Sequence, residues 1–368
     1  MKSPAGNSAL TISTPGRICL FGEHQDYLRL PVIPCAISLR IAVTGASRSD
    51  ARVIIRLPDI HAREEFSLEG PLTYPGERAY LRSAVNVLRR EGYTFTRGVD
   101  CTVSGRIPIN SGTSSSSALT VSWVNFLSHM SDQHRALPPD ECARLAHAAE
   151  VLEFHEPGGM MDHYATAFGG VIAVDFAPRV TVESFEAALG TFVLGDSHEP
   201  KDTKGILARV KNQVLDAAEK LRKKFAEFSL HTVRIDELER FRAELPRQQY
   251  TLLEGTLRNR DITRRARLML KEKVLDHIGL GELLTEHQTI LRDVLDISTK
   301  KIDRMLEKAI AAGALGGKIN GSGGGGCMFV YAPGRAVAVG EAIEQCGGTP
   351  YIVAADAGTR VDEKEPAG

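Results

Sequence analysis

Short runs of alternating or continuous hydrophobic residues fill the first half of the chain, with helical patterns between them. The runs with strand character lie at 31–45, 52–57, 99–105 and 169–176. Apolar residues three or four apart predict helices over 79–92, 115–130 and 140–155. This alternation predicts a mixed α/β first half.

The pattern changes near residue 180. Charged, strongly helical segments follow at 207–228, 263–275 and 289–313. A glycine-dense loop then leads to a strand at 327–333, a helix and a final strand-like segment. Together with the length of 368 residues, this change predicts two domains, 1–180 and 181–368.

Composition narrows the class of protein. The net charge is −1, so we expect no strong attraction to nucleic acid or to a membrane surface. The six cysteines form no CxxC pair, which favours reduced thiols over a zinc site or a disulfide framework. No apolar run is long enough for a membrane span, and the first residues lack the apolar core of a signal peptide. We therefore expect a cytoplasmic protein.

One apolar run ends in a cluster of polar side chains. Residues 18–21 are strand-like and stop at Gly22, and Glu23, His24 and Asp26 follow within four residues. A buried strand would not carry such a cluster, and a surface turn would not need the apolar run before it. The pattern therefore predicts a polar ligand at the end of this strand.

Two loops are rich in small residues. The stretch 108–119, PINSGTSSSSAL, lies between a predicted strand and a predicted helix, where unpaired N–H groups favour a phosphate and the hydroxyls of 114–117 add donors. The alternative is a capped helix start, although one serine would suffice for a cap. The stretch 318–329 contains a GxGxxG string, but a strand follows it, so we reject a dinucleotide site and retain a hairpin turn as the alternative.

Two carboxylates flank a predicted helix break. Glu150 lies in a helical pattern that breaks at 157–159, and Asp162 follows where a new helix begins. That placement favours the ionised form of Asp162. Considered singly, Asp162 is equally well explained as an N-cap, and Glu150 is better explained as a solvated helix residue.

Together these segments resemble the GHMP kinases, and within them most closely the galactokinase family. PGRICLFGEHQDYLRLPVIPCAI is similar to the sugar-binding motif GRxNLIGEHTDYxxGxVLPxAI, and PINSGTSSSSAL to the phosphate loop PxxxGLSSSA. EVLEFHEPGGMMD keeps the spacing of E…PxGxMD, and GGKINGSGGGGC is similar to GxxxTGGGFGGC. The resemblance implies an α/β fold of the α+β type, with two domains and the active site in the cleft between them.

The resemblance also implies the role of each matching residue. Sugar hydroxyls would bind Glu23, His24 and Asp26, with Gly159 beside them, and Arg17 and Asp162 would be catalytic. The residues implied for the ATP phosphates are Gly112, Ser114, Ser115, Ser116 and Ser117, and those implied for Mg²⁺ are Ser116 and Glu150. The implied activity is phosphoryl transfer from ATP to the anomeric hydroxyl of a galactose-type sugar, by a protein that is most simply a monomer.

Departures from the family motifs leave the acceptor open. Gln25 and Asn320 each stand where the family motifs have a threonine, Thr113 stands in place of a leucine, and Ser117 stands in place of an alanine. The residues Leu28-Arg29-Leu30 stand where the motif has a polar stretch that contains a glycine. An acidic sugar, an inositol or an isoprenoid alcohol stays an alternative acceptor, and a catalytically silent sugar and ATP sensor is an alternative from another class. Arg29 would select an anionic acceptor if it faced the pocket, or would be neutral to the choice if it pointed to solvent.

Overall fold

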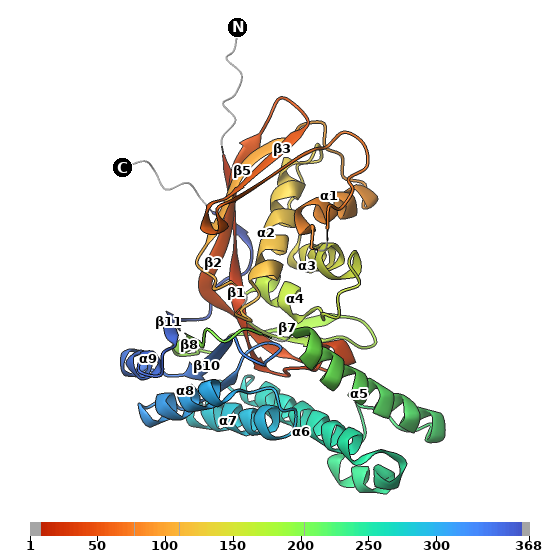
Figure 1. Ribbon diagram of the computed structural model, residues 1–368, viewed down its shortest axis with the longest axis vertical. Coiled ribbons are helices and arrows are strands. Elements are labelled where there is room, and N and C mark those ends of the chain that lie inside the picture. Colours follow the sequence, from red (N-terminus) through yellow and green to blue (C-terminus); the bar gives the residue numbers. More distant parts are fainter. Residues whose placement is uncertain (1–8, 77, 110, 202, 363–368) are drawn as a thin grey trace.

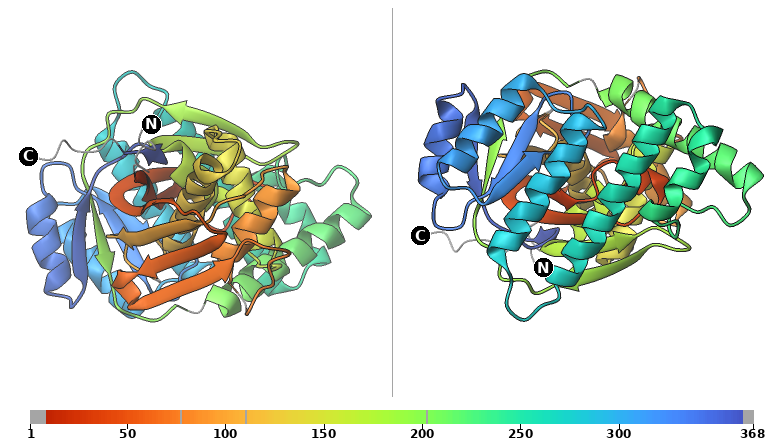
Figure 2. Two further views of the ribbon diagram at one scale, coloured as in Figure 1. Left: turned by 90° about the horizontal axis from the view of Figure 1, so that it is seen from above. Right: turned by 90° about the horizontal axis from the view of Figure 1, so that it is seen from below.

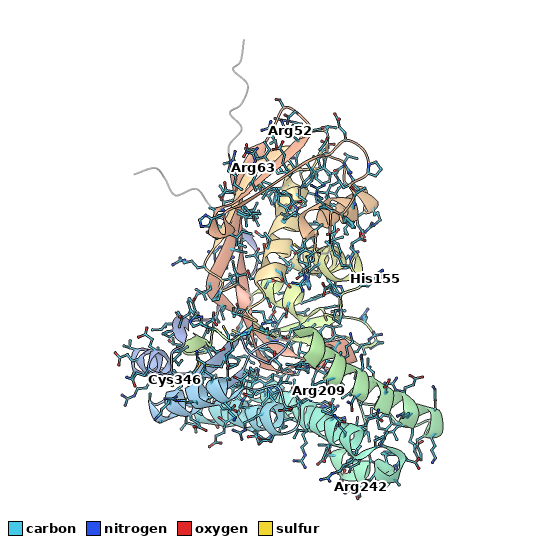
Figure 3. All side chains as sticks on the ribbon, in the orientation of Figure 1. Arg52, Arg63, His155, Arg209, Arg242 and Cys346 are labelled. Carbon is cyan, nitrogen blue, oxygen red and sulfur yellow. The ribbon has the colours of Figure 1, made fainter. Side chains whose placement is uncertain are left out.

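The computed structural model describes residues 9–362 except 77, 110 and 202. Two units lie end to end along the molecule (Figure 1). The first has a long twisted sheet with helices on one face, and the second has a small sheet and most of the long helices. Figure 2 shows the same arrangement from both ends, and Figure 3 adds the side chains in the orientation of Figure 1.

The first sheet contains eight strands in the described part of the chain, in the order β12-β1-β2-β5-β3-β4, with β6 on β2 and β7 on β6. Their bounds are β1 Leu10–Phe21, β2 Ile33–Ser47, β3 Arg52–Leu57, β4 Ala62–Ser67, β5 Val99–Gly105, β6 Val171–Asp175, β7 Thr181–Phe185 and β12 Arg360–Val361. Only the β3–β5 pair is parallel among these described strands. The last described strand, β12, therefore pairs with the first, β1.

Helices cover one face of this sheet (Figure 1). They are α1 Tyr80–Arg90, α2 Ser115–Met130, α3 Pro139–His147 and α4 Met161–Phe168. Short turns complete the unit: η1 Asp26–Leu28, η2 Pro58–Ile60 and the π-helical η3 Ala148–Leu152. Helix α2 is buried on nearly every side, with Trp123 fully buried, so its N-terminus is held firmly at one end of the sheet.

The second unit is built on an antiparallel sheet of order β11-β8-β10-β9. Its strands are β8 Phe192–Asp196, β9 Gly316–Ile319, β10 Cys327–Tyr331 and β11 Thr349–Val353. Its helices are α5 Thr203–Lys224, α6 Arg247–Met269, α7 His277–Asp293, α8 Lys300–Ala311 and α9 Ala336–Glu344, with the 3-10 segment η4 Ile235–Glu244 before α6. The glycine-dense loop is the hairpin between β9 and β10.

Strand β1 joins the two units. Near its end, Ile18 and Leu20 pack into the apolar core of the second unit, whereas Cys19 packs into the core of the first. Because side chains alternate along a strand, one strand end can be buried on both faces in this way. The residues that follow, from Gly22 onward, are therefore fixed at the junction of the units.

Most elements expected from the sequence are present, and one expectation was wrong. The helical pattern at 289–313 is two helices, because α7 ends at Asp293 and α8 begins at Lys300. Between them Asp296 has a φ of 52°, and the Thr299 side chain accepts a hydrogen bond from the N–H of Ile302 and caps α8. The division at 180 stays a prediction, since β7 continues the first sheet to Phe185.

Candidate active site

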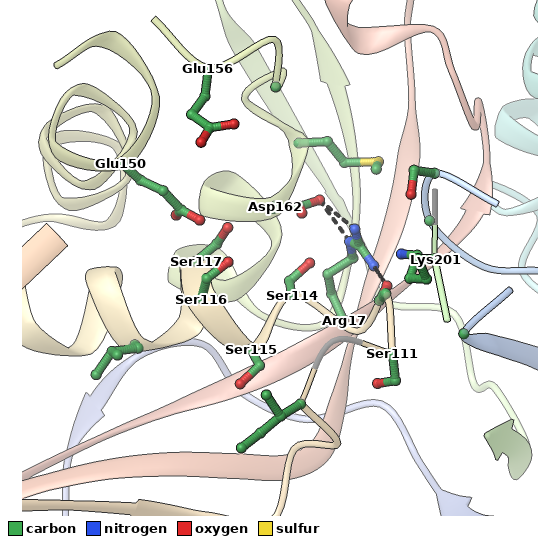
Figure 4. Close-up of a pocket in the computed structure, with 18 of the residues that line it drawn as sticks. Arg17, Ser111, Ser114, Ser115, Ser116, Ser117, Glu150, Glu156, Asp162 and Lys201 are labelled. Atoms are coloured by element: carbon green, nitrogen blue, oxygen red, sulfur yellow. Dashed lines mark hydrogen bonds and ion pairs between the residues drawn. The ribbon is translucent and has the colours of Figure 1, made fainter. Parts of the chain in front are cut away.

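A cavity of about 1230 Å³ opens where the two units meet. All of the site residues expected from the sequence line it: Arg17, Glu23, His24, Asp26, Gly112, Ser114, Ser115, Ser116, Ser117, Glu150, Gly159 and Asp162. Figure 4 shows the part around Arg17. Motifs far apart in the chain thus meet at one site, although the role of each residue remains to be tested.

Arg17 and Asp162 form an ion pair at the centre of the cavity. Arg17 Nε donates to Asp162 Oδ1 over 2.8 Å, and Nη2 lies 2.6 Å from the same oxygen (Figure 4). Burial by itself would raise the pKa of Asp162, but the charge and hydrogen bonds of Arg17 outweigh it and hold that pKa below its ordinary value. Asp162 is therefore an ionised acceptor at neutral pH.

The carbonyl of Gly112 ties three motifs together. It accepts hydrogen bonds from Arg17 Nη1 over 2.5 Å and from Asn320 Nδ2 over 2.8 Å. Asn320 Oδ1 in turn accepts from the N–H of Cys19 on β1 over 2.9 Å. The asparagine that departs from the family motif thus links β1, the serine-rich segment 111–117 (the serine loop) and the glycine-rich hairpin between β9 and β10.

The serine loop leads directly into helix α2. Ser114 precedes the helix with a left-handed φ of 61°, and its buried hydroxyl lies beside Asp162, whose pKa it helps to lower. Ser116 is exposed to the cavity, and Ser117 is buried beside it. A row of serine hydroxyls next to the free N–H groups of a helix start suits an anionic ligand.

Glu150 lies in the π-helical turn after α3, a local distortion that is frequent at functional sites. Its Oε2 is 2.7 Å from Nε2 of His163, and both side chains are almost fully buried. The carboxylate faces the hydroxyls of Ser116 and Ser117 in Figure 4. One carboxylate and one hydroxyl fit a hard cation such as Mg²⁺ if phosphate oxygens and water complete its shell.

Glu23 is buried and supports the glycine-rich hairpin. Its side chain is paired with the ammonium of Lys318, and its Oε1 accepts from the N–H of Gly321 over 2.6 Å. The carbonyl of Glu23 accepts from Asn259 Nδ2 on α6 over 2.8 Å. Both carboxylate oxygens are therefore engaged, and a direct sugar contact by Glu23 remains a prediction.

His24 is also held by the protein. Its Nε2 lies 3.0 Å from the carbonyl oxygen of Ser322, and its Nδ1 lies 2.8 Å from the hydroxyl of Tyr27. Because a carbonyl can only accept, Nε2 carries the proton and Nδ1 accepts from the tyrosine. Burial lowers the pKa of His24, so this neutral tautomer links the strand end to the hairpin.

Asp26 is partly exposed and faces Asp162. Its Oδ1 accepts from the N–H of Tyr27 over 2.8 Å. Burial, and then the negative charge of Asp162, raise the pKa of Asp26 to about 6. Glu23 and His24 are buried, so Asp26 is the most exposed of the three polar residues after β1 and has carboxylate surface left for a ligand in the cavity.

Arg29 points away from the cavity. Its guanidinium donates to the carbonyl oxygens of Phe176, over 2.7 and 3.1 Å, and of Pro178, over 3.2 Å. Gln25, another departure from the family motif, donates to the carbonyl of Thr256 on α6 over 3.0 Å. Neither residue lines the cavity, so neither selects the acceptor by direct contact.

Sequence reasoning missed several residues of the site. Lys201, in the loop after β8, lies beside Arg17 in Figure 4. Lys318 and His163 hold Glu23 and Glu150. The available signal was weak. Lys318 stands inside the quoted glycine-rich motif and His163 directly follows the motif that ends at Asp162, whereas Lys201 lies in no motif, just before the charged helical segment.

Three models of known protein families match segments of this chain. The GHMP kinases N terminal domain matches residues 79–170, and the GHMP kinases C terminal domain matches 268–348. The galactokinase galactose-binding signature matches residues 3–47. Together these matches cover more than half of the chain and include the strand end, the serine loop, Glu150 and Asp162. No described helix is long and apolar enough to cross a membrane.

Similar proteins include two kinds of kinase. A galactokinase from Mannheimia succiniciproducens is 29% identical over 89% of this chain and 86% of its own length, and a mevalonate kinase from Thermococcus gammatolerans is 29% identical over 96% and 98%. The crystal structure of Lactococcus lactis galactokinase complexed with galactose has a TM-score of 0.84 and 22% identity over 96% of this chain and 95% of its own. The Methanococcus jannaschii mevalonate kinase structure has a TM-score of 0.72 and 19% identity over 96% and 100%. The predicted two-domain fold is confirmed, and the chain belongs to the GHMP kinases, a superfamily of phosphotransferases.

Proposed function

We propose that this protein transfers the γ-phosphoryl group of ATP to the anomeric hydroxyl of a galactose-type monosaccharide. The observation that carries the proposal is the Arg17–Asp162 pair, which faces the start of α2 across the cavity. The galactose-binding signature over residues 3–47 supports a sugar as acceptor.

Asp162 orients the acceptor and takes its proton. Its carboxylate is ionised, so it accepts a hydrogen bond from the reacting hydroxyl. Because its pKa is low, it is a weak base, and the proton moves to it as the oxygen–phosphorus bond forms. Arg17 keeps the carboxylate in place and offsets negative charge on the transferred group. Most of the rate enhancement then comes from positioning and charge neutralisation.

The ATP phosphates would lie on the serine loop, where the N–H groups at the start of α2 and the hydroxyls of Ser114 to Ser117 act as donors. Ser116 and Glu150 would hold Mg²⁺, which neutralises phosphate charge when it is bound. His163 fixes the Glu150 carboxylate for that purpose.

The adenine would lie against apolar side chains at the sheet end of the cavity. These side chains come from the neighbouring strands β2, β5 and β3 and from the segments beside them: Ile41, Val103, Leu57, Ile60, Ile109 and Leu119. Ile60 and Ile109 are each 55% exposed. Exposed isoleucines at the mouth of a cavity suit the faces of a nucleobase.

A mevalonate-type alcohol is the second candidate acceptor. Curated mevalonate kinases are as similar in sequence as the galactokinases, and they match over nearly their whole length. Against this candidate stand the galactose-binding signature and the carboxylate of Asp26, which would repel an acidic acceptor.

An acceptor panel tests the proposal. The protein is incubated with Mg²⁺ and ATP and with galactose, glucose, galacturonate, myo-inositol or mevalonate, and ADP release is measured. Galactose should give the highest kcat/KM, and ³¹P NMR should show the product phosphate coupled to the anomeric proton. Turnover of mevalonate alone would replace the sugar assignment. ATP and sugar binding without any turnover would indicate a sensor.

A further inference from the structure

The loop after β8 brings a lysine into the cavity from the second unit. Lys201 lines the cavity beside Arg17, on the side opposite Asp162 (Figure 4). Its Nζ lies against the serine loop, because a β-carbon on Gly112 would be 2.7 Å from it. A β-carbon on Gly321 would be 3.3 Å from the same Nζ. The ammonium group is thus wedged between the serine loop and the glycine-rich hairpin.

The protein holds this lysine in a fixed position. The hairpin residue Gly326 donates its N–H to the carbonyl of Glu199 over 3.0 Å, and its own carbonyl accepts from the N–H of Ser197 over 2.9 Å. A β-carbon on Gly326 would lie 2.8 Å from Cδ of Lys201, and one on Gly325 would lie 2.6 Å from the carbonyl of Pro200. These glycines have a positive φ and leave room for the lysine stem.

The charge balance at this end of the cavity calls for an anion. Arg17 is paired with Asp162, and Lys318 is paired with Glu23. Lys201 is a third cation, at Gly112 and Gly321, whereas the carboxylate of Asp26 lies against Gly159 on the Asp162 side. Burial, and then the positive charge of Arg17, lower the pKa of Lys201. Holding a partly buried ammonium beside a guanidinium is unfavourable unless a negative ligand arrives.

We propose that Lys201 binds the terminal phosphoryl group of ATP and stabilises its charge during transfer. Under the proposed function, on which this inference rests, the metal end of the serine loop lies at Ser116 and Glu150. Its reacting end lies at Gly112, next to Arg17 and Asp162. The γ-phosphoryl group therefore lies at the Gly112 end, where the Nζ of Lys201 is. The second unit contributes a cation to a phosphate site built mainly by the first.

Nucleotide binding separates this role from others without any turnover. Calorimetry in the presence of Mg²⁺ compares ATP with ADP for wild type, Lys201→Met and Lys201→Arg. Loss of one charge-assisted contact should weaken ATP binding by about tenfold or more, while ADP binding changes less than about twofold. Lys220→Met is the matched control, because Lys220 is exposed on α5 and bonds to Gln249; both affinities should stay at the wild-type value.

Turnover supplies a second readout. Lys201→Met should lower kcat by on the order of 10²-fold, as removal of a preorganised donor does, and Lys201→Arg should retain more. The kcat of wild type should fall at alkaline pH as Lys201 loses its proton, and this loss should shift to higher pH in Lys201→Arg. Thermal melting should show both variants folded, since removal of a partly buried charge beside another cation does not destabilise the free protein.

The inference would be overturned if Lys201→Met lost ATP and ADP affinity equally, or if it lost neither. It would also be overturned if Lys201→Met raised the KM for an anionic acceptor and left the ratio of ATP affinity to ADP affinity unchanged, because Lys201 would then bind the acceptor. If wild type transfers no phosphoryl group to any acceptor, the proposed function fails, but the binding ratio still decides the role of Lys201.

Discussion

The carboxylate of Asp26 fills the space above Gly159. A β-carbon on Gly159 would lie 1.8 Å from Asp26 Oδ2 and 2.2 Å from its Cγ, whereas a β-carbon on the adjacent Gly158 would meet only a Val151 methyl at 3.6 Å. The glycine at the helix break is therefore needed so that the carboxylate of Asp26, which follows β1, can approach.

Gly159→Ala should displace Asp26 from the cavity. We expect the KM for the acceptor to rise by about tenfold, as for loss of one good hydrogen bond to a charged group, with little change in the KM for ATP. Steady-state kinetics with each substrate varied in turn measures the effect. Gly158→Ala is the control, and a similar rise in both variants would show that the loop, rather than Asp26, was disturbed.

Asp26→Asn should stabilise the free protein above pH 6. The pKa of Asp26 is raised from 3.8 to about 6, so the folded state binds this proton more tightly than the unfolded state. Stability from this group is then fully present below pH 3.8 and is lost as the pH rises through about 6. The loss is at most about 3 kcal/mol, and less because the side chain is partly exposed.

Urea unfolding at pH 5 and pH 7.5 measures this effect. The free energy of unfolding of Asp26→Asn should exceed that of wild type at pH 7.5, with a smaller difference at pH 5. The same variant should bind the acceptor more weakly, because an amide is a poorer acceptor than a carboxylate. Equal stability of the two proteins at both pH values would mean that the carboxylate is well solvated.

Asp162→Asn should keep the fold and lower kcat by on the order of 10²-fold or more, within the range for a general base. The Arg17 guanidinium would then lack its negative partner, so a moderate drop in melting temperature should accompany the loss. Turnover is measured at saturating acceptor and ATP, with Asn86→Asp as an unrelated change of the same size at a site that bonds to Leu72 and Tyr74. Near wild-type turnover in Asp162→Asn would assign the proton to another group.

The site could be found from the sequence where the chemistry is carried by local motifs. Glu23, His24 and Asp26 stand together after one strand, and Ser114 to Ser117 stand together at the start of one helix. The contacts that decide their roles are long-range. The pairing of Glu23 with Lys318 joins residues 295 positions apart, and no local pattern shows that this carboxylate supports a hairpin.

In the fold, too, elements set by local sequence could be predicted, and elements set by long-range contacts could not. The helices α1 and α2 were predicted almost to the residue. The buried positions of α1 repeat over several turns, and α2 is a long, mostly apolar run of residues that suit a helix. The short strand β9, with two glycines, exists through its pairing with β10, and its own residues favour no strand. The break between α7 and α8 depends on a single residue with positive φ, Asp296, in an otherwise helical pattern.

Arg29→Ala should leave the choice of acceptor unchanged. The guanidinium bonds to the carbonyls of Phe176 and Pro178 and does not line the cavity. Loss of these contacts should lower the free energy of unfolding by about 1–2 kcal/mol. The ratio of kcat/KM for galactose over galacturonate is the measurement, and a ratio that changes by tenfold or more would place Arg29 in acceptor selection after all.

Ser116→Ala and Glu150→Gln should each raise the Mg²⁺ concentration needed for the half-maximal rate, since a hard cation loses one oxygen ligand or one charge. Glu150→Gln can still accept the hydrogen bond from His163, so its effect reports the charge and not a collapsed turn. The two changes should not add in the double variant, because both act on one ion. Ser115→Ala is the matched control: its hydroxyl lies away from Glu150 in Figure 4, and its Mg²⁺ dependence should match wild type. If both Ser116→Ala and Glu150→Gln keep the wild-type Mg²⁺ dependence, the metal is held by other groups.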